Sequence, residues 1–114
     1  MDVIEQLDAL RGAHRAVEAA AYVDFKSGTV LASSAVIAPP QERLDALCET
    51  AGHLLDGPAG QAVQATMLSP AEAIVIQRAD DTAGEALCLI CAANADLADL
   101  GAAAKRLVTE IGGR

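Results

Sequence analysis

The sequence predicts an α/β (α+β) sandwich, in which helices cover both faces of one five-stranded antiparallel sheet. Apolar residues recur with a helical or a strand period in the order helix, two strands, helix, three strands, helix. The strands follow one another as hairpins rather than alternating with helices, which excludes a doubly wound parallel sheet. The length of 114 residues suits a single domain, residues 1–114, without repeats or linkers.

The first helix is expected from about Val3 to Glu18. Asp2 is placed to cap its N-terminus, and Glu5, three residues later, completes a variant of the capping box. Apolar residues at helical spacing, together with His14, which we expect to be half-buried, then form one stripe. This stripe consists of Val3, Leu7, Leu10, His14 and Val17.

A β-hairpin is expected next, with strands over residues 20–25 and 29–35. Residues alternate between two faces in the first of these segments, and β-forming residues fill the second. Gly28 is best suited to the positive φ of the turn between them, which Asp24 and Lys26 flank. No phosphate-binding loop signature accompanies these residues. We therefore interpret Asp24 and Gly28 as parts of a scaffold turn.

A second helix is expected after Pro39 and Pro40 and before Gly57, since proline is tolerated in a first helical turn and glycine commonly follows a helix end. Its apolar face is wide. It could cover the sheet, reach a second subunit, or do both. The face comprises Leu44, Leu47, Cys48, Ala51, Leu54 and Leu55.

Three more strands and a helix complete the chain. The strands are expected over residues 62–69, 72–79 and 85–93, with the last two pairing across a polar turn that holds Asp80, Asp81 and Gly84. Either Asn94 or Asp96 is expected to cap the final helix, which two glycines end at residues 112–113.

The charge and composition restrict the classes of partner. The net charge is −8, which disfavours nucleic acid and anionic membrane surfaces because both attract cationic proteins. It favours a protein partner with a basic face, or simply keeps the chain in solution. No apolar run approaches the ~20 residues of a membrane span. Three cysteines suit reduced thiols, and we expect a cytoplasmic protein.

The residue types that often carry chemistry do not form a recognisable site. Cys88 and Cys91 form a C-x-x-C pair, but residues three apart on a strand point to opposite faces, so the thiols should diverge. His14 and His53 are the only histidines, and Cys48 does not share a helix face with His53. We expect buried structural thiols, no catalytic residue, no metal and no cofactor.

The order of elements and the first hairpin resemble the roadblock family, named for a dynein light chain. That family has a strand of the form A-x-V-x-D, a turn with glycine, and a strand that ends in small residues. A late apolar strand pair, Asn94-Ala95-Asp96 and a glycine-bearing helix also fit, so the resemblance covers nearly the whole chain. The matching hairpin residues are Ala21, Val23, Asp24, Gly28, Val30, Leu31, Ala32 and Ser33.

The resemblance implies a profilin-like sandwich, with the first and third helices on one face of the sheet and the second on the other. It also implies a homodimer formed through the second helix and the third strand. The corresponding interface residues here are Leu44, Leu47, Cys48, Ala51, Leu54, Val63, Ala65 and Met67. A heterodimer with a related chain is an open alternative.

Members of the roadblock family, including bacterial ones, act as regulators or scaffolds of small Ras-like GTPases or as adaptors. The resemblance therefore implies a non-enzymatic homodimer that binds such a GTPase, with an adaptor or GTPase-activating role. For the activating role, Arg43 is the exposed candidate for an arginine finger supplied in trans.

A second hypothesis is a small-molecule sensor domain of profilin-like or PAS-like architecture. Such a domain needs an apolar cavity with converging polar groups. Aromatic residues are only 2% of the chain and alanine is abundant, which favours a tightly filled core instead. An enzyme would need a titratable cluster, and the sequence shows none.

Overall fold

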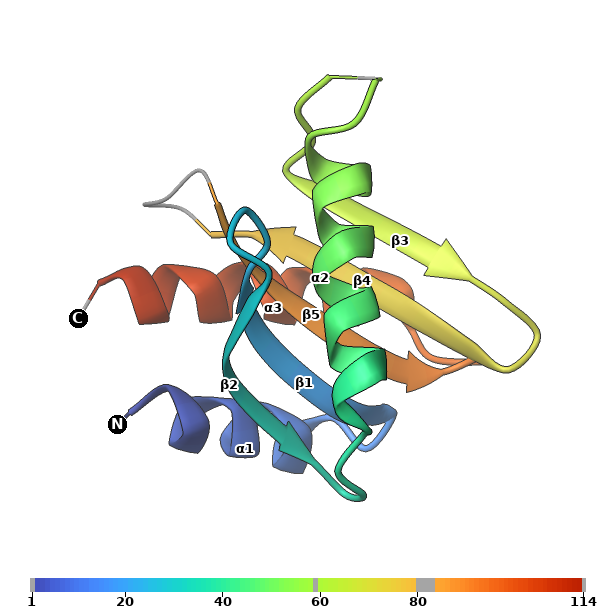
Figure 1. The fold of residues 1–114 in the computed structure, drawn as a ribbon. Coiled ribbons are helices and arrows are strands. Elements are labelled where there is room, and N and C mark those ends of the chain that lie inside the picture. Colours follow the sequence, from blue (N-terminus) through green and yellow to red (C-terminus); the bar gives the residue numbers. More distant parts are fainter. Residues whose placement is uncertain (1, 59, 80–83, 114) are drawn as a thin grey trace.

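The computed structural model describes residues 2–58, 60–79 and 84–113 and contains the predicted sheet and helices (Figure 1). The strands have the order β2-β1-β5-β4-β3, and every neighbouring pair is antiparallel. The predicted fold class and order of elements are confirmed. The elements are α1 (Val3–Ala13), β1 (Val17–Asp24), β2 (Thr29–Ala35), α2 (Gln41–Leu55), β3 (Gln64–Leu68), β4 (Glu72–Arg78), β5 (Glu85–Ala92) and α3 (Leu97–Gly112).

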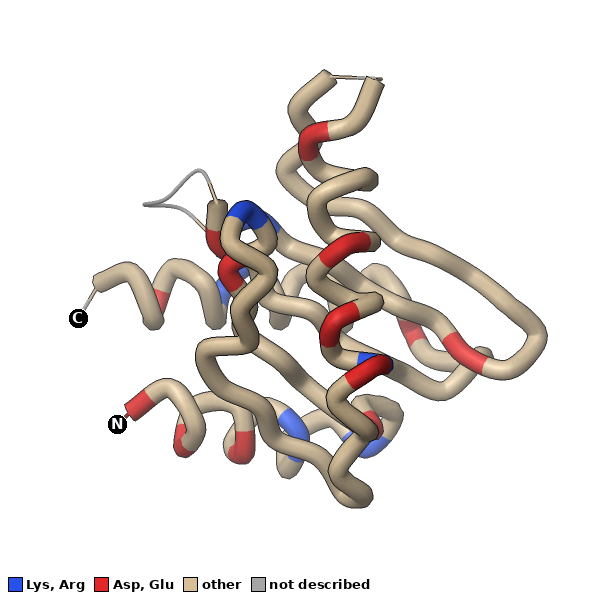
Figure 2. Tube along the Cα trace, in the orientation of Figure 1, with Lys and Arg blue, Asp and Glu red and all other residues tan. Residues whose placement is uncertain are grey.

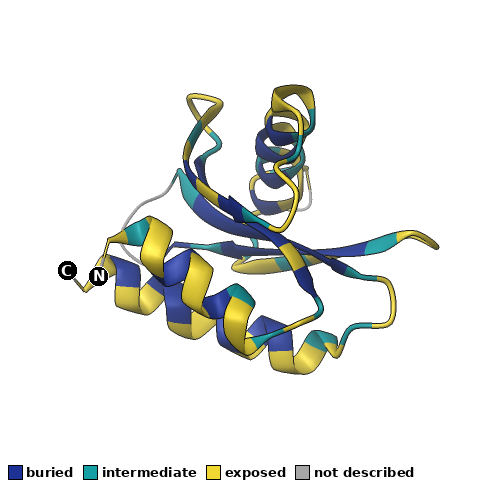
Figure 3. Ribbon diagram, turned by 90° about the horizontal axis from the view of Figure 1, so that it is seen from below, coloured by how far each residue is buried: buried dark blue, intermediate teal, exposed yellow. Residues whose placement is uncertain are grey.

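The helices form two layers around the sheet. The first core cluster lies between α1, α3 and one sheet face, and the second lies between α2 and the other face. Figure 3 shows the pair of helices below the sheet and α2 above it, each with its buried side turned inward. Within the described parts of the chain, none of the helices combines the length and apolarity that crossing a membrane requires.

The first helix is shorter than predicted, because it ends at Ala13 rather than near Glu18. The capping box of Asp2 and Glu5 is present as predicted. His14 already has an extended backbone, with φ −130° and ψ 94°. Val17, predicted as the end of the helical stripe, instead begins β1 and pairs with Cys91. Burial in the sheet decided its conformation, since a β-branched residue packs well on a pleated surface.

The other boundaries agree with those predicted or differ from them by up to three residues, and both ends of β2 agree. β1 begins three residues earlier than expected, and β3 is shorter by two residues at its start and one at its end. Asp96 rather than Asn94 caps α3, accepting a hydrogen bond from the Asp99 backbone N–H at 3.1 Å. β4 and β5 pair as predicted. The turn expected at Asp80 and Asp81 lies outside the described residues.

A polar network attaches the edge strand β3 to its neighbours. The Gln64 side-chain amide donates to Oε1 of the buried Gln77 at 2.7 Å and to the backbone oxygen of Gly101 in α3 at 3.0 Å. A Cβ atom at Gly101 would lie 2.9 Å from Oε1 of Gln64. Glycine at this point of α3 therefore lets the Gln64 amide approach the helix backbone.

Replacing Gly101 with valine is expected to lower the free energy of unfolding by about 2 kcal/mol, the usual cost of overpacking. The added side chain pushes the Gln64 amide away from α3, and Gln77 loses its polar neighbour. Chemical denaturation followed by circular dichroism measures this change.

Ala102→Val is the matched control, since Ala102 is the exposed neighbour of Gly101 on the same helix. Valine there should cost only a few tenths of a kcal/mol through helix propensity. Equal losses for both variants would show that contact with Gln64 does not require glycine at position 101.

Candidate functional site

The turn of the first hairpin is a structural element. The Asp24 carboxylate accepts hydrogen bonds from the backbone N–H groups of Lys26 and Ser27, at 3.1 and 3.2 Å. Gly28 has φ +74°, a left-handed conformation that suits glycine. Asp24 thus acts as the acceptor that closes the turn, the usual role of an aspartate at this position.

The cysteines are buried and point into different parts of the core. Cys88 lies in the cluster beneath α2, while Cys91 lies in the cluster beneath α1 and α3, so the C-x-x-C pair diverges as predicted. Burial raises the pKa of Cys88 to about 12 and that of Cys91 to about 11. Burial, together with the charges of Asp45 and Asp24, also raises the pKa of Cys48. Thiols of this kind stay protonated at neutral pH and are poor nucleophiles.

Each of the two histidines lies near a different carboxylate. His14 follows α1 and places Nδ1 3.3 Å from a carboxylate oxygen of Asp99, which connects the end of α1 to the start of α3. His53 lies on the exposed side of α2 with Nε2 3.8 Å from Glu49, whereas Cys48 faces the sheet. Among the described residues, no group of three or more His, Cys, Asp or Glu side chains could hold a metal ion.

The residues predicted at a subunit interface divide into two sets. Leu44, Leu47, Cys48 and Ala51 are buried within the protomer, where they pack α2 onto the sheet. The others lie at or near the surface around β3. They are Leu54, Val63 and Met67, which are exposed, and Ala65, which is partly buried. A second subunit approaching this side of the molecule would meet the latter set.

The free edge of β3 is regular and carries no charge. Its sequence, QATML, has neither a charged residue nor a proline. Arg78 donates its backbone N–H to Val63 at 2.8 Å, so by the alternation of an antiparallel ladder the N–H groups of Thr66 and Leu68 point away from β4. An edge of this kind is a template for pairing with another strand.

The opposite edge of the sheet, β2, is interrupted. Tyr22 pairs with Ala32 and Val23 pairs with Val30, which leaves Leu31 as the extra residue of a β-bulge. Bulges twist an edge strand and hinder pairing with a further strand. Of the two edges, β3 is therefore the better suited to extend the sheet.

Arg78 holds the segment that leads into β3, and the sequence analysis did not identify it. Its guanidinium donates to the backbone oxygens of Leu55 and Ala62, each at 2.9 Å, and contacts the Asp56 carboxylate at 2.5 Å. It also lies over the ring of Phe25, 5.8 Å from the centroid. One side chain thus joins the end of α2 to the start of β3. The sequence feature that could have indicated this role is an arginine that directly follows a mostly apolar strand segment.

The outer surface of α2 is acidic. Glu42, Asp45 and Glu49 follow one another at intervals of three and four residues and are exposed, so they share one side of the helix. Figure 2 shows acidic positions repeated along this helix. The stripe gives the side of the molecule that carries α2 a negative surface.

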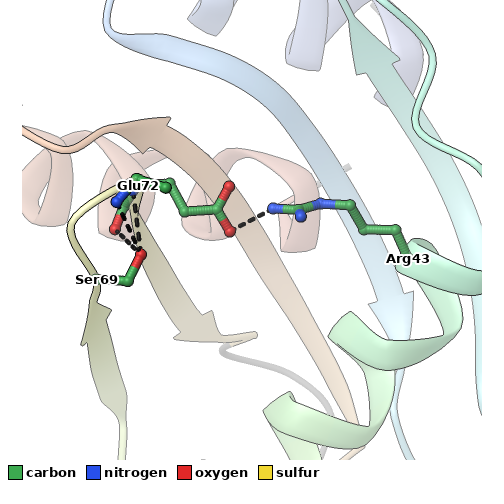
Figure 4. Close-up of polar contacts among 4 residues, drawn as sticks. Arg43, Ser69 and Glu72 are labelled. Carbon is green, nitrogen blue, oxygen red and sulfur yellow. Dashed lines mark hydrogen bonds and ion pairs between the residues drawn. The ribbon is translucent and has the colours of Figure 1, made fainter.

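Arg43, the predicted arginine-finger candidate, has a partner within the chain. Its guanidinium forms an ion pair with Glu72 at the start of β4, on the face of the sheet that α2 covers (Figure 4). The Glu72 backbone is held by Ser69, whose hydroxyl accepts from the Glu72 N–H at 3.2 Å. Arg43 would have to break this ion pair before it could act as an arginine finger.

Comparisons with known proteins identify the fold. The sequence matches no protein-family model and no curated protein. A Roadblock/LC7 domain from Streptomyces avermitilis is 17% identical, with a TM-score of 0.76 over 99% of this chain and 97% of that one. The gliding protein MglB from Thermus thermophilus is 19% identical, with a TM-score of 0.72 over 95% of this chain and 84% of that one.

A further MglB structure, described as having a tetrameric arrangement, is 19% identical, with a TM-score of 0.71 over 95% of this chain and 83% of that one. The likeness to these bacterial proteins extends over nearly the whole described fold. The predicted roadblock fold is thereby confirmed.

Proposed function

We propose that this chain, which has the roadblock fold, is a non-enzymatic homodimeric regulator or scaffold that binds a small Ras-like GTPase in the cytoplasm. The resemblance to the roadblock family supports a regulatory or adaptor role. The likeness to an MglB with a tetrameric arrangement supports assembly of several copies. The net charge of −8 supports a partner with a basic surface.

The observation that carries the homodimer is the free edge of β3. Two copies related by a two-fold axis can align their β3 strands antiparallel and join two sheets into one. Thr66 and Leu68 then exchange hydrogen bonds with the second copy. Exposed Val63 and Met67 lie along the same strand, and exposed Leu54 lies on α2 beside it, so pairing removes apolar surface from water.

An adaptor or conformational role is better supported than an arginine finger. Arg43 is engaged with Glu72, and Arg78 is engaged with Leu55, Asp56 and Ala62. A dimer that binds one state of the GTPase switch loops more tightly shifts the population toward that state without supplying a catalytic group.

The sensor hypothesis has less support from the packing beneath α2. The space between Leu47, Cys88 and Ile90 leaves a volume of about 0 Å³ for a water-sized molecule. The alanines of β1 bring the helix and the sheet into close contact at this place. A ligand entering here would have to displace core side chains.

Thr66→Pro is expected to convert the dimer into a folded monomer. Proline removes the outward N–H of Thr66, which a second β3 strand would need, and leaves the hydrogen bonds to β4 in place. Light scattering of the full chain measures the solution mass, and circular dichroism verifies that the protomer stays folded.

Ser33→Pro on the other edge is the matched control. Val36 donates its backbone N–H to Glu18 at 3.2 Å, so the same alternation turns the N–H of Ser33 outward from β2. This variant should keep the dimeric mass. A monomeric wild-type chain, or a Thr66→Pro dimer of unchanged stability, would contradict pairing through β3.

A further inference from the structure

A hollow of about 410 Å³ opens between the first turn of α2 and the sheet. Its floor is apolar and comes from Ala19 in β1 and Ile90 in β5, both buried against α2. The β2–α2 connection forms one wall, and the ion pair of Arg43 and Glu72 forms another (Figure 4). The space can receive one or two bulky apolar side chains.

Two large apolar residues at the entrance of this hollow, Val36 and Ile37, are mostly exposed to solvent. The exposed fraction is 74% for Val36 and 84% for Ile37. Their backbone is nonetheless restrained, because Val36 donates its N–H to Glu18 at 3.2 Å and two prolines follow at positions 39 and 40. Exposed apolar groups on a restrained backbone beside a hollow are typical of a binding surface, since little backbone order is lost on binding.

The surroundings of the hollow are acidic. Glu18 lines it, and Glu42 and Asp45 lie outside it, on the exposed side of the first two turns of α2. Arg43, the cation among the lining residues, is neutralised by Glu72. An approaching group with positive charge is attracted here, and one with negative charge is repelled.

We infer that this hollow is the docking site for a segment of a partner protein that carries a bulky apolar side chain flanked by lysine or arginine. The apolar side chain enters between Ile37 and Ile90, and the basic residues face Glu18 and the acidic side of α2. The inference rests on the proposed function, because it assigns the partner's chemistry to one surface of the scaffold.

A second copy of this chain is a poor occupant for two reasons. The residues that line the hollow come from β1, β4, β5, the β2–α2 connection and α2, and none comes from β3, so pairing through β3 leaves the hollow open. The net charge of −8 also sets acidic surface against acidic surface. The occupant therefore differs from this chain in charge.

The inference is tested by immobilising this chain and selecting from random peptides displayed on phage. The enriched peptides should share a bulky apolar residue flanked by lysine or arginine. A synthetic copy of one is then titrated into the chain and followed by fluorescence anisotropy. Ile37→Asp should weaken binding about tenfold or more, as expected of a central apolar contact. Reversal of Glu42 and Asp45 to lysine should weaken it and reduce its dependence on salt.

Leu31→Asp is the matched control, since it also places a charge at an exposed apolar residue but lies on β2 away from the hollow. It should leave peptide binding unchanged. Enriched peptides without basic residues, binding that Ile37→Asp does not weaken, or no enriched peptide at all would overturn the inference.

The solution mass separates this inference from the proposed dimer. Ile37→Asp should remain dimeric, and loss of the dimer in that variant would place the hollow in a subunit contact and overturn the docking site. A monomeric wild-type chain that still binds the peptides through Ile37 would instead contradict the dimer alone.

Discussion

A chain with Leu47→Glu is expected to lose its folded structure, and not merely a contact with another subunit. Leu47 is 4% exposed and lies in the core between α2 and the sheet. A carboxylate there has no cation among the apolar side chains of this cluster, and burying an unpaired charge ranks among the most destabilising changes. The expected loss is about 4 kcal/mol or more, a large part of the ~5–15 kcal/mol that stabilises a typical domain. Thermal and chemical denaturation measure it.

Leu54→Glu is the control on the same helix. Leu54 is 36% exposed, so a glutamate there reaches water and should change the stability of the protomer by less than about 1 kcal/mol. It should weaken the dimer instead, because Leu54 faces the side on which the second β3 strand is proposed to lie. A folded Leu47→Glu monomer of normal stability would show that Leu47 serves the interface rather than the core.

Arg78→Ala is expected to lower the free energy of unfolding by about 3 kcal/mol. It removes the donors to the backbone oxygens of Leu55 and Ala62 and leaves the Asp56 carboxylate without its cation. The segment before β3 loses its attachment to the end of α2, so hydrogen exchange over residues 61–66 should accelerate more than exchange in β1. Denaturation and exchange followed by mass spectrometry measure the two effects.

Arg43→Ala provides the comparison, because it also removes an arginine from an ion pair. The Arg43 side chain is 40% exposed, and a pair in contact with water usually contributes less than about 1 kcal/mol. Arg78→Ala should therefore lower the free energy of unfolding more than Arg43→Ala does. Equal losses would show that the backbone contacts of Arg78 contribute little.

The parts of the fold that depend on local pattern could be predicted from the sequence. The turn at Gly28, the capping box at Asp2 and the alternation along the strands involve residues only a few positions apart. The divergence of Cys88 and Cys91 follows from the strand period alone. The order of the hairpins also excludes a doubly wound parallel sheet, because tight turns join antiparallel strands.

Features that depend on distant contacts could not be predicted in the same way. The stripe on the first helix included Val17, and only the pairing of Val17 with Cys91 shows that this residue belongs to β1. The apolar face of α2 identified residues that need burial, yet helical spacing cannot tell a sheet of the same chain from a second subunit. Arg78 acts on Leu55 and Ala62, which are 23 and 16 residues away in the sequence.

The most direct test of the proposed dimer is the hydrogen exchange of two backbone amides in the unmodified chain. The N–H groups of Thr66 and Leu68 point away from β4, so the described protomer offers them no strand partner. Pairing of β3 with a second copy predicts that both are protected, that dilution removes this protection, and that the outward N–H of Ser33 on β2 stays unprotected. Exchange of Thr66 and Leu68 at the rate of Ser33, at every concentration, would contradict assembly through the β3 edge.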